Sequence, residues 1–322
     1  MATTSPTITL VIPTYNRGNL IAQTLDSALA QSVPFLDIVV VDDGSRDDTG
    51  AVLARYAGRV QAITVANGGV QRARNIGVAA ARGEFVVLCD SDDLLEPAYV
   101  ATMQSWLAAH DDCDSIYSNF VTFNEHGVQA DKFAGAPAGF FAGAARTGAF
   151  WHAIPDLYAR TLDYQPLFPS GSLVRRRVYQ AIGGYDPQFN GVGAEDYEFA
   201  LRLIDHASVA LCATPLVRVR KHGGNDSTDN VRQVRGCVQI LEFALQHHAG
   251  AATHRAAVLA SIDARRLDIF NGAFARGAFE IAADTLRQLP QRPPGRNFAL
   301  KAWITGLPHL LRQPLWRLTQ AR

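Results

Sequence analysis

Short apolar runs alternate with helix-periodic segments through the first third of the chain, and this alternation limits the fold more than any other feature. The apolar runs have the length of buried strands and cover residues 8–13, 37–43, 60–65, 84–90 and 115–119. Helical spacing is found between and after them, over residues 19–31, 48–57, 70–81 and 97–109. Strands that alternate with helices are typical of βαβ units. The sequence therefore predicts an α/β fold with a Rossmann-like, mainly parallel sheet flanked by helices.

The pattern changes after residue 120. Residues 125–165 are rich in Gly, Ala, Phe and Pro, which predicts an irregular connection. Helical spacing returns at 195–205, and two short strand-like runs follow at 208–213 and 216–221. The chain after residue 230 then shows helical segments alone, over 231–249, 252–271, 274–289 and 297–318. We therefore expect a first domain over residues 1–229 and an α-helical C-terminal region over residues 230–322.

Charge and cysteine usage exclude several classes of protein. Thirty basic and thirty acidic side chains cancel, so no global field attracts nucleic acid, and we expect none as a partner. The four cysteines lie far apart without a C-x-x-C pair, which favours a reducing compartment over a disulfide scaffold. The N-terminus lacks the pattern of a signal peptide, and no run approaches the roughly 20 apolar residues of a spanning helix. A cytoplasmic location is therefore expected.

Three of the predicted strands end in polar clusters. These clusters are Pro13-Thr14-Tyr15-Asn16-Arg17, Asp42-Asp43-Gly44-Ser45 and Asp90-Ser91-Asp92-Asp93. The carboxyl ends of parallel strands share one edge of a sheet, where open α/β sheets bind their ligands. Each cluster taken alone could instead be an ordinary solvated turn. Their recurrence at three strand ends favours one shared site.

The D-S-D segment suits a divalent cation. Residues two apart in an extended chain face the same side, so Asp90 and Asp92 can address one ion. Two carboxylates with open positions suit Mg²⁺ or Mn²⁺, which commonly bridge to substrate phosphates. The alternative is an acidic cap on the helix predicted at 97–109, a role that Asp93 could fill in either case.

A nucleotide would not be held here by a common phosphate-binding loop, because neither G-x-x-x-x-G-K-[ST] nor G-x-G-x-x-G occurs. A metal ion would have to neutralise a diphosphate instead. Arg72 and Arg74 follow a Gly-Gly turn, and guanidinium groups are good donors to phosphate and base edges. The alternative for this segment is a plain surface helix.

Six segments occur in an order that identifies a family. They are I-P-T-Y-N-R at 12–17, D-D-G-S at 42–45, G-V-Q-R-A-R-N-I-G at 69–77, D-S-D-D at 90–93, P-S-G-S-L-V-R-R at 169–176 with G-G-Y-D at 183–186, and E-D-Y-E-F-A-L-R-L at 195–203. Together they resemble the motifs of glycosyltransferase family 2, which has the GT-A fold. The resemblance covers residues 8 to about 222. It implies a catalytic domain over residues 1–229, with a nucleotide-sugar half at about 1–120 and an acceptor half at about 121–229.

The resemblance also implies roles for individual residues. A nucleotide-sugar donor would be bound by Pro13, Thr14, Tyr15, Arg17, Asp42, Asp43, Arg72, Asp90 and Ser91. The metal, Mn²⁺ or Mg²⁺, would be held by Asp92 as the main ligand, with Asp90 and His222. A surface histidine is the alternative for His222. Gly223 and Gly224 would let the next segment close over the donor, because glycine is permissive in its backbone.

Asp196, the second residue of E-D, matches the general base of the family. Its place near a predicted helix start suggests that the helix dipole keeps the carboxylate ionised and able to accept a proton. The alternative is a plain N-terminal helix charge without a catalytic role. With Asp196 as base, a metal-assisted, inverting transfer of sugar from a UDP-sugar to a glycan or lipid-linked acceptor is predicted. A nucleotidyltransferase on a related fold and a non-catalytic sugar-nucleotide or glycan-binding module are the alternatives.

The basic C-terminal segment lies outside the resemblance. Its basic residues follow Asp284, after which no Asp or Glu occurs; they are Arg287, Arg292, Arg296, Lys301, Arg312, Arg317 and Arg322. Leu300, Trp303, Ile304, Leu307 and Leu311 share one helical face, followed by Leu315 and Trp316. Such a segment can lie on an anionic membrane surface, here the inner face of the plasma membrane. Packing on the catalytic domain or in a homodimer is the alternative. The family's processivity motif Q-x-x-R-W is absent from the sequence, which predicts addition of one sugar per encounter.

Overall fold

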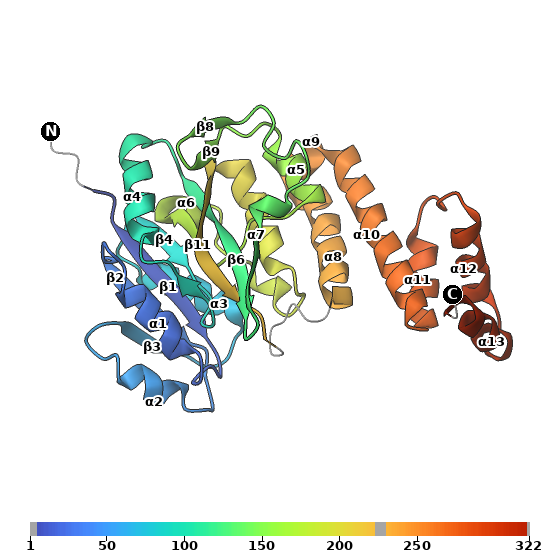
Figure 1. Cartoon of the computed structure of the whole chain (residues 1–322), viewed down its shortest axis with the longest axis horizontal. Coiled ribbons are helices and arrows are strands. Elements are labelled where there is room, and N and C mark those ends of the chain that lie inside the picture. The colour runs from blue at the N-terminus through green and yellow to red at the C-terminus, as the bar shows by residue number, and fades with distance from the viewer. Residues whose placement is uncertain (1–4, 223–229, 321–322) are drawn as a thin grey trace. The chain divides into compact units, whose positions relative to one another are not determined.

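The chain folds as two compact units. The computed structural model describes residues 5–222 and 230–320 (Figure 1). One unit contains Met1–Gly191 and Glu195–Asn225, and the other contains Val192–Ala194 and Asp226–Arg322. The segment predicted to close over the donor, with Gly223 and Gly224, lies outside the described residues.

One mixed sheet organises the first unit. Its first four strands run in the order β3-β2-β1-β4, all parallel, and are β1 (Ile8–Thr14), β2 (Asp37–Asp42), β3 (Gln61–Thr64) and β4 (Phe85–Leu88). Next comes β10 (Ser172–Arg175), which runs antiparallel both to β4 and to β6 (Ser115–Asn124). Then β11 (Val209–Arg220) runs parallel to β6. The predicted Rossmann-like, mainly parallel sheet is therefore confirmed.

Two predictions about the second half of this unit are wrong. The connection at 125–165 is ordered into β7 (Gly127–Asp131), β8 (Ala145–Thr147), β9 (Phe150–His152), a 3₁₀ turn (Phe133–Gly135) and α5 (Leu157–Asp163). These strands extend the sheet, because β7 pairs with β6 and β9 pairs with β11 and β8. The two strand-like runs at 208–221 form the single strand β11. Its pairing with β6 shifts register around Pro215, where the missing N–H interrupts the ladder.

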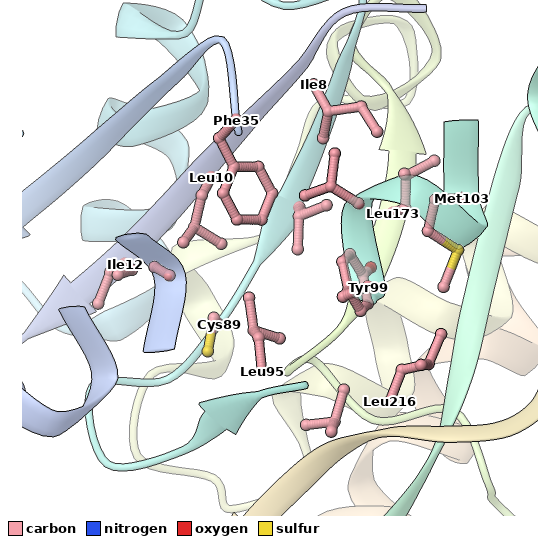
Figure 2. Packing of buried hydrophobic residues seen from close by; sticks show 14 of the residues in the cluster. Ile8, Leu10, Ile12, Phe35, Cys89, Leu95, Tyr99, Met103, Leu173 and Leu216 are labelled. Carbon is pink, nitrogen blue, oxygen red and sulfur yellow. The ribbon is translucent and has the colours of Figure 1, made fainter. Parts of the chain in front are cut away.

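Helices cover both faces of the sheet. One face carries α1 (Ile21–Leu29), α2 (Thr49–Ala54) and α4 (Tyr99–Ala109), and the other carries α3 (Val70–Ala80), α5, α6 (Arg176–Ala181) and α7 (Glu195–His206). Side chains alternate along a strand, so Leu10 of β1 joins the first core cluster and Val11 joins the second. Figure 2 shows the first cluster, where Tyr99 and Met103 of α4 lie near Leu173 of β10.

The short strand β5 (Leu94–Leu95) joins the acidic segment to the sheet. It follows Asp90–Asp93 directly and pairs with β11 at Val217 and Arg218. Tyr99, a few residues further on, is fully buried and donates its hydroxyl to the carbonyl of Gly171, 2.8 Å away. The carboxyl end of β4 is therefore fixed to two later parts of the chain.

The second unit is helical, as predicted. It contains α8 (Asn230–His247), α9 (Ala249–Thr253), α10 (Arg255–Ala275), α11 (Phe279–Gln288), α12 (Arg296–Gly306) and α13 (His309–Gln320). The single helix expected at 297–318 is two helices. Leu307 is extended (φ −75°, ψ 152°) because the residue before a proline is driven out of the helical region, and Pro308 follows. None of the described helices combines the length and hydrophobicity that a membrane crossing needs.

Candidate active site

The ends of β1 and β2 meet through their loops. Asn16, at a left-handed φ of 50°, donates its backbone N–H to the Ser45 hydroxyl at 2.9 Å, and its side-chain oxygen accepts the N–H of Arg46 at 2.7 Å. The Asp42 carboxylate accepts the backbone N–H of Ser45 at 2.9 Å. The first two polar clusters therefore form one edge, as the sequence predicts. Thr14 at this edge is buried, and its hydroxyl has no hydrogen-bond partner within the described residues.

Asp43 holds a turn in place. Its carboxylate accepts the backbone N–H groups of Gly68 and Gly69, both at 2.8 Å, and the side-chain amide of Asn67 at 3.1 Å. Gly69 is the residue before α3 and has a φ of 93°, which only glycine adopts without strain. Asp43 therefore fixes the start of α3, and both of its carboxylate oxygens are already hydrogen bonded.

Arg74, not Arg72, reaches the acidic segment. Residues two apart on a helix point to nearly opposite sides. Arg72 is exposed and donates to the carbonyl of Ala66, whereas Arg74 is buried and donates to Asp90 Oδ1 at 2.7 Å. The Arg74 guanidinium also lies over the ring of Tyr185, 4.7 Å from its centre. Two of its nitrogens, Nε and Nη1, are buried without a hydrogen-bond partner in the described part of the chain.

Asp92 meets residues from two distant segments. His222 Nε2 lies 3.0 Å from Asp92 Oδ2, and Arg17 Nε lies 3.7 Å from the same oxygen. Asp92 is 8% exposed. The predicted partnership of Asp92 and His222, 130 residues apart in sequence, is thus present in the geometry. Ser91, the residue between the two acids, is buried, and its carbonyl accepts the hydroxyl of Thr24 at 3.0 Å.

Asp93 has a structural place beside this pair. Its carboxylate accepts the Ser170 hydroxyl at 2.5 Å and the backbone N–H of Arg220 at 2.8 Å. Burial, together with the charges of Asp90 and Asp92, holds the pKa of Asp93 well above its usual range. The expected helix cap is not its role, because Ala98 precedes α4 and Asp93 bonds elsewhere. Asp93 joins the start of β10 and the end of β11 to the acidic segment.

The described side chains at this edge do not supply a full set of ligands for a metal ion. No group of three or more His, Cys, Asp or Glu side chains that could hold a metal occurs in the described part of the chain. Asp92 with His222 and Asp90 with Arg74 supply two carboxylates at one edge. Carboxylate oxygens suit Mg²⁺ or Mn²⁺ that take their remaining ligands from water and substrate phosphates. The residues therefore fit an ion that is shared with a diphosphate.

Asp196 lies in the first turn of α7 and is half-buried. Burial and the neighbouring Glu195 raise its pKa to about 7, against the opposing effects of Arg74 and of the Tyr197 N–H that it accepts at 2.9 Å. The charge of Asp90 also raises this pKa, so the two acids lie within electrostatic reach of each other. The helix-dipole argument made from the sequence is therefore outweighed: desolvation disfavours the charged form more than the helix start favours it.

Sequence reasoning missed several residues of this edge. Tyr185 lies under Arg74, Glu195 acts on Asp196, and Ser170 bonds to Asp90; Arg74 was named with Arg72 but not assigned to the site. Helix periodicity could have found Arg74, because α3 buries Gln71, Ala73, Arg74, Gly77 and Val78. The P-S-G-S segment, which the sequence analysis quotes, contains Ser170. In the structure the Ser170 hydroxyl accepts the Asp90 N–H at 2.9 Å.

The fold is of the GT-A type. A mainly parallel sheet carries an acidic edge with a paired Asp-Arg and a half-buried carboxylate beside it. Comparison with known sequences gives the family: the sequence model of glycosyl transferase family 2 matches residues 9–179. The chain belongs to this family, and relatives that match it are named as glycosyltransferases.

Curated relatives share the first part of the chain. Glycosyltransferase GlyA of Streptococcus pneumoniae is 35% identical over 121 residues, which are 37% of this chain and 17% of that protein. Glycosyltransferase GlyG of the same organism is 30% identical over 38% of this chain and 41% of its own length. Putative glycosyltransferase EpsH of Bacillus subtilis is 34% identical over 40% of this chain and 38% of its own length. The matches thus span less than half the length of each of these relatives.

A solved structure resembles nearly the whole chain. Residues 1–349 of S. aureus TarS in complex with UDP-GlcNAc match with a TM-score of 0.63 at 19% identity, covering 98% of this chain and 90% of that TarS fragment. The same part of TarS in complex with UDP matches with a TM-score of 0.62 at 18% identity. At this level of identity the likeness establishes the fold, and it confirms the expected GT-A architecture.

Proposed function

We propose that the enzyme transfers one sugar from a UDP-sugar to a glycan or lipid-linked glycan, with inversion at the anomeric carbon. The observation that carries this proposal is the convergence of Asp90, Asp92 and Asp196 at one edge of the sheet. Arg74 forms an ion pair with Asp90, and its charge also lowers the pKa of Asp196. TarS has been solved in complex with UDP-GlcNAc and with UDP. These complexes make UDP-GlcNAc the first donor to test.

The donor is proposed to lie along the ends of β1, β2 and β4. The nucleoside would contact Pro13, Thr14, Tyr15 and Asp42, with Arg72 at the margin. The unpartnered Thr14 hydroxyl and the unpartnered nitrogens of Arg74 support a polar ligand here, because a buried polar group without a partner costs about 1–3 kcal/mol.

In our proposal the diphosphate lies beside Asp90, Asp92, Arg17 and His222. Mn²⁺ or Mg²⁺ held there by Asp92 with Asp90 and His222 would supply neutralisation of the diphosphate charge. Arg74 keeps Asp90 in place by donating to its Oδ1 at 2.7 Å. Asp43 acts in this proposal as a positioning residue that fixes the start of α3, since its oxygens are occupied by Asn67, Gly68 and Gly69.

Asp196 is proposed as the general base. As the acceptor hydroxyl oxygen bonds to the anomeric carbon, its proton passes to the Asp196 carboxylate, and the bond from the anomeric carbon to the diphosphate oxygen breaks. A base with a pKa of about 7 is well matched to this task near neutral pH. The Asp196 carboxylate accepts a proton far better than an ordinary carboxylate does, and about half of the enzyme molecules carry it in the ionised form at pH 7.

We also propose where the reaction takes place. The enzyme acts in the cytoplasm at the inner face of the plasma membrane, where a lipid-linked acceptor is within reach. The separated cysteines support the reducing compartment: Cys89, Cys113 and Cys212 are buried and unpaired in the structure. The basic helices of the second unit support contact with lipid.

Calorimetric titration with UDP, GDP and TDP, each with and without Mn²⁺, tests the donor site. Binding of UDP that strengthens with Mn²⁺ is expected, and Asp92→Ala should abolish the strengthening. An Asp92→Ala variant that still gained affinity with Mn²⁺ would overturn the metal assignment.

Turnover of UDP-GlcNAc then tests the base. Asp196→Asn is expected to keep UDP affinity and lose transfer, because a missing base lowers turnover more than ground-state binding. Asp205→Asn, near the other end of α7, is the matched control and should keep the wild-type rate. Near-normal turnover in Asp196→Asn would refute the role.

A further inference from the structure

The helices α12 and α13 gather most of the exposed large hydrophobic side chains in the described part of the chain. The described residues include nine exposed large hydrophobic side chains. Five of the nine lie in α12 and α13: Leu300 (46%), Trp303 (55%), Leu310 (86%), Leu311 (58%) and Leu318 (68%). Single exposed apolar residues are normal on a protein surface, whereas a group of them marks an interaction surface. We call these five residues the apolar patch.

The patch follows helical spacing on each helix. Leu300 and Trp303 are three residues apart on α12, and exposed Arg296 lies one turn before Leu300. Leu310, Pro314 and Leu318 are each four apart on α13 and are all exposed. Side chains three or four apart share one side of a helix. Leu300 and Trp303 therefore form a short exposed apolar stripe on α12, and Leu310, Pro314 and Leu318 form one on α13.

The outward stripe is not what holds α13 to its unit. Trp316 donates its indole N–H to the carbonyl of Phe274 at 2.7 Å, and Trp316 and Leu315 pack on the cluster of Phe274, Phe279 and Ile304. Ile304, Leu315 and Trp316 thus serve the inner core of the unit, although the sequence pattern placed them on a membrane-facing surface. The residues of the apolar patch remain on the outer side, where stability of the unit does not require them.

Charge indicates what covers the patch. Seven basic residues and no acidic one follow Asp284, and exposed Arg296 and Arg317 stand beside the stripes of α12 and α13. Apolar residues flanked by arginine suit the boundary between anionic headgroups and acyl chains. A symmetric dimer through the same face would bring like charges together, which is unfavourable.

We propose that the apolar patch, with Arg296 and Arg317, docks the enzyme on an anionic lipid bilayer. This inference goes beyond sugar transfer and deepens the proposed location by naming the surface that makes the contact. Leu310 and Leu318 enter the acyl boundary, and the two arginines meet lipid phosphates. Its test requires no donor or acceptor, so its failure is distinguishable from failure of the proposed transferase reaction.

Vesicle flotation of the full chain tests the proposal. The chain should float with phosphatidylcholine vesicles that contain phosphatidylglycerol, and should float less with phosphatidylcholine alone. The triple variant Leu310→Gln, Leu311→Gln, Leu318→Gln should lose about 100-fold or more in vesicle affinity, because each leucine loses its apolar burial. Leu259→Gln, at a 41% exposed leucine of α10, is the matched control and should bind as the wild type does.

A charge variant separates the two contributions. Arg296→Gln with Arg317→Gln should weaken binding about 30-fold, since an arginine near an anionic surface contributes about 1 kcal/mol. Exposed Arg55 and Arg177, changed to Gln together, form the control and should have no effect. Circular dichroism and the thermal unfolding midpoint confirm that each variant is folded.

Three outcomes would overturn the proposal. One is vesicle binding that is unchanged by the leucine triple variant. Another is sedimentation of the wild type as a dimer that the triple variant converts to a monomer, with no vesicle binding by either; the patch would then join two copies of the chain. The third is a monomer that binds no vesicle of either composition.

Discussion

Lowering the pH from 8 to 6 should slow sugar transfer about tenfold through the protonation of Asp196. Its pKa is raised to about 7 by burial and by Glu195. A base must be deprotonated to accept the acceptor's proton, and a raised pKa means that this form is lost as the pH falls through 7. The ionised fraction is about nine tenths at pH 8 and about one tenth at pH 6. With the ordinary aspartate pKa of about 3.9, the same change would alter the rate by about 1%.

The assay is the initial rate of UDP release from UDP-GlcNAc at low donor concentration, measured between pH 5.5 and 8.5. UDP affinity measured in parallel separates loss of the base from loss of the donor site. A rate that falls about fivefold from pH 7 to pH 6 and approaches a tenfold fall per unit below that, with UDP affinity unchanged, is the expected result. The reasoning is refuted by a rate that stays level down to pH 5.5, because Asp196 would then be either an ordinary carboxylate or not the base.

Three further changes test other parts of the structure. Arg74→Met removes the cation that opposes protonation of Asp196, so the pH at half-maximal rate should rise by about one unit; an unchanged profile in the folded variant would contradict this. Asp43→Asn should lower the free energy of unfolding in urea by about 2–4 kcal/mol, because an amide cannot accept both the Gly68 and the Gly69 N–H; a loss below 0.5 kcal/mol, on the order of a surface change, would be inconsistent with that role. Gly77→Ala should cost about 1–2 kcal/mol, since the new Cβ would lie 2.3 Å from Val11 Cγ1. Gly50→Ala, which meets nothing within 4 Å, should be neutral or stabilising, and equal effects at the two glycines would rule out the packing argument.

The strands β1, β2 and β4 could be predicted because they are buried on both faces. β1 and β4 are buried along their whole length and appear in the sequence as mainly apolar runs. In contrast, β8 and β9 are three residues long each, and β8 is fully exposed, so they leave no periodic signal. The strand β10 could not be predicted for another reason: its four residues lie inside the segment P-S-G-S-L-V-R-R, and only the pairing with β4 and β6 defines it.

The site could be predicted as far as strand ends determine it. Asp42, Asp90 and Asp92 follow directly from the rule that parallel strands share an edge, and the structure brings their segments to that edge. Arg74 could not be chosen over Arg72 from composition, since both are arginines near the same turn. The pKa of Asp196 depends on burial by segments that are distant in sequence, which local reasoning about a helix start cannot supply.

Because β10 runs antiparallel to β4, residues 1–120 do not form the acidic edge on their own and could not be moved alone into another protein. Because β10 runs against β4, its first residues return to the acidic edge, where Ser170 bonds to Asp93 and to the Asp90 N–H. A fragment that stopped at the end of β6 would contain every acid of the donor site and lack the hydroxyl that orders two of them. Recombination that exchanges acceptor-binding segments therefore has to keep residues 170–175 with the recipient. A crossover placed before Ser170 breaks this edge, and one placed after Arg175 has to keep Arg220 and His222 as well, because they contact Asp93 and Asp92.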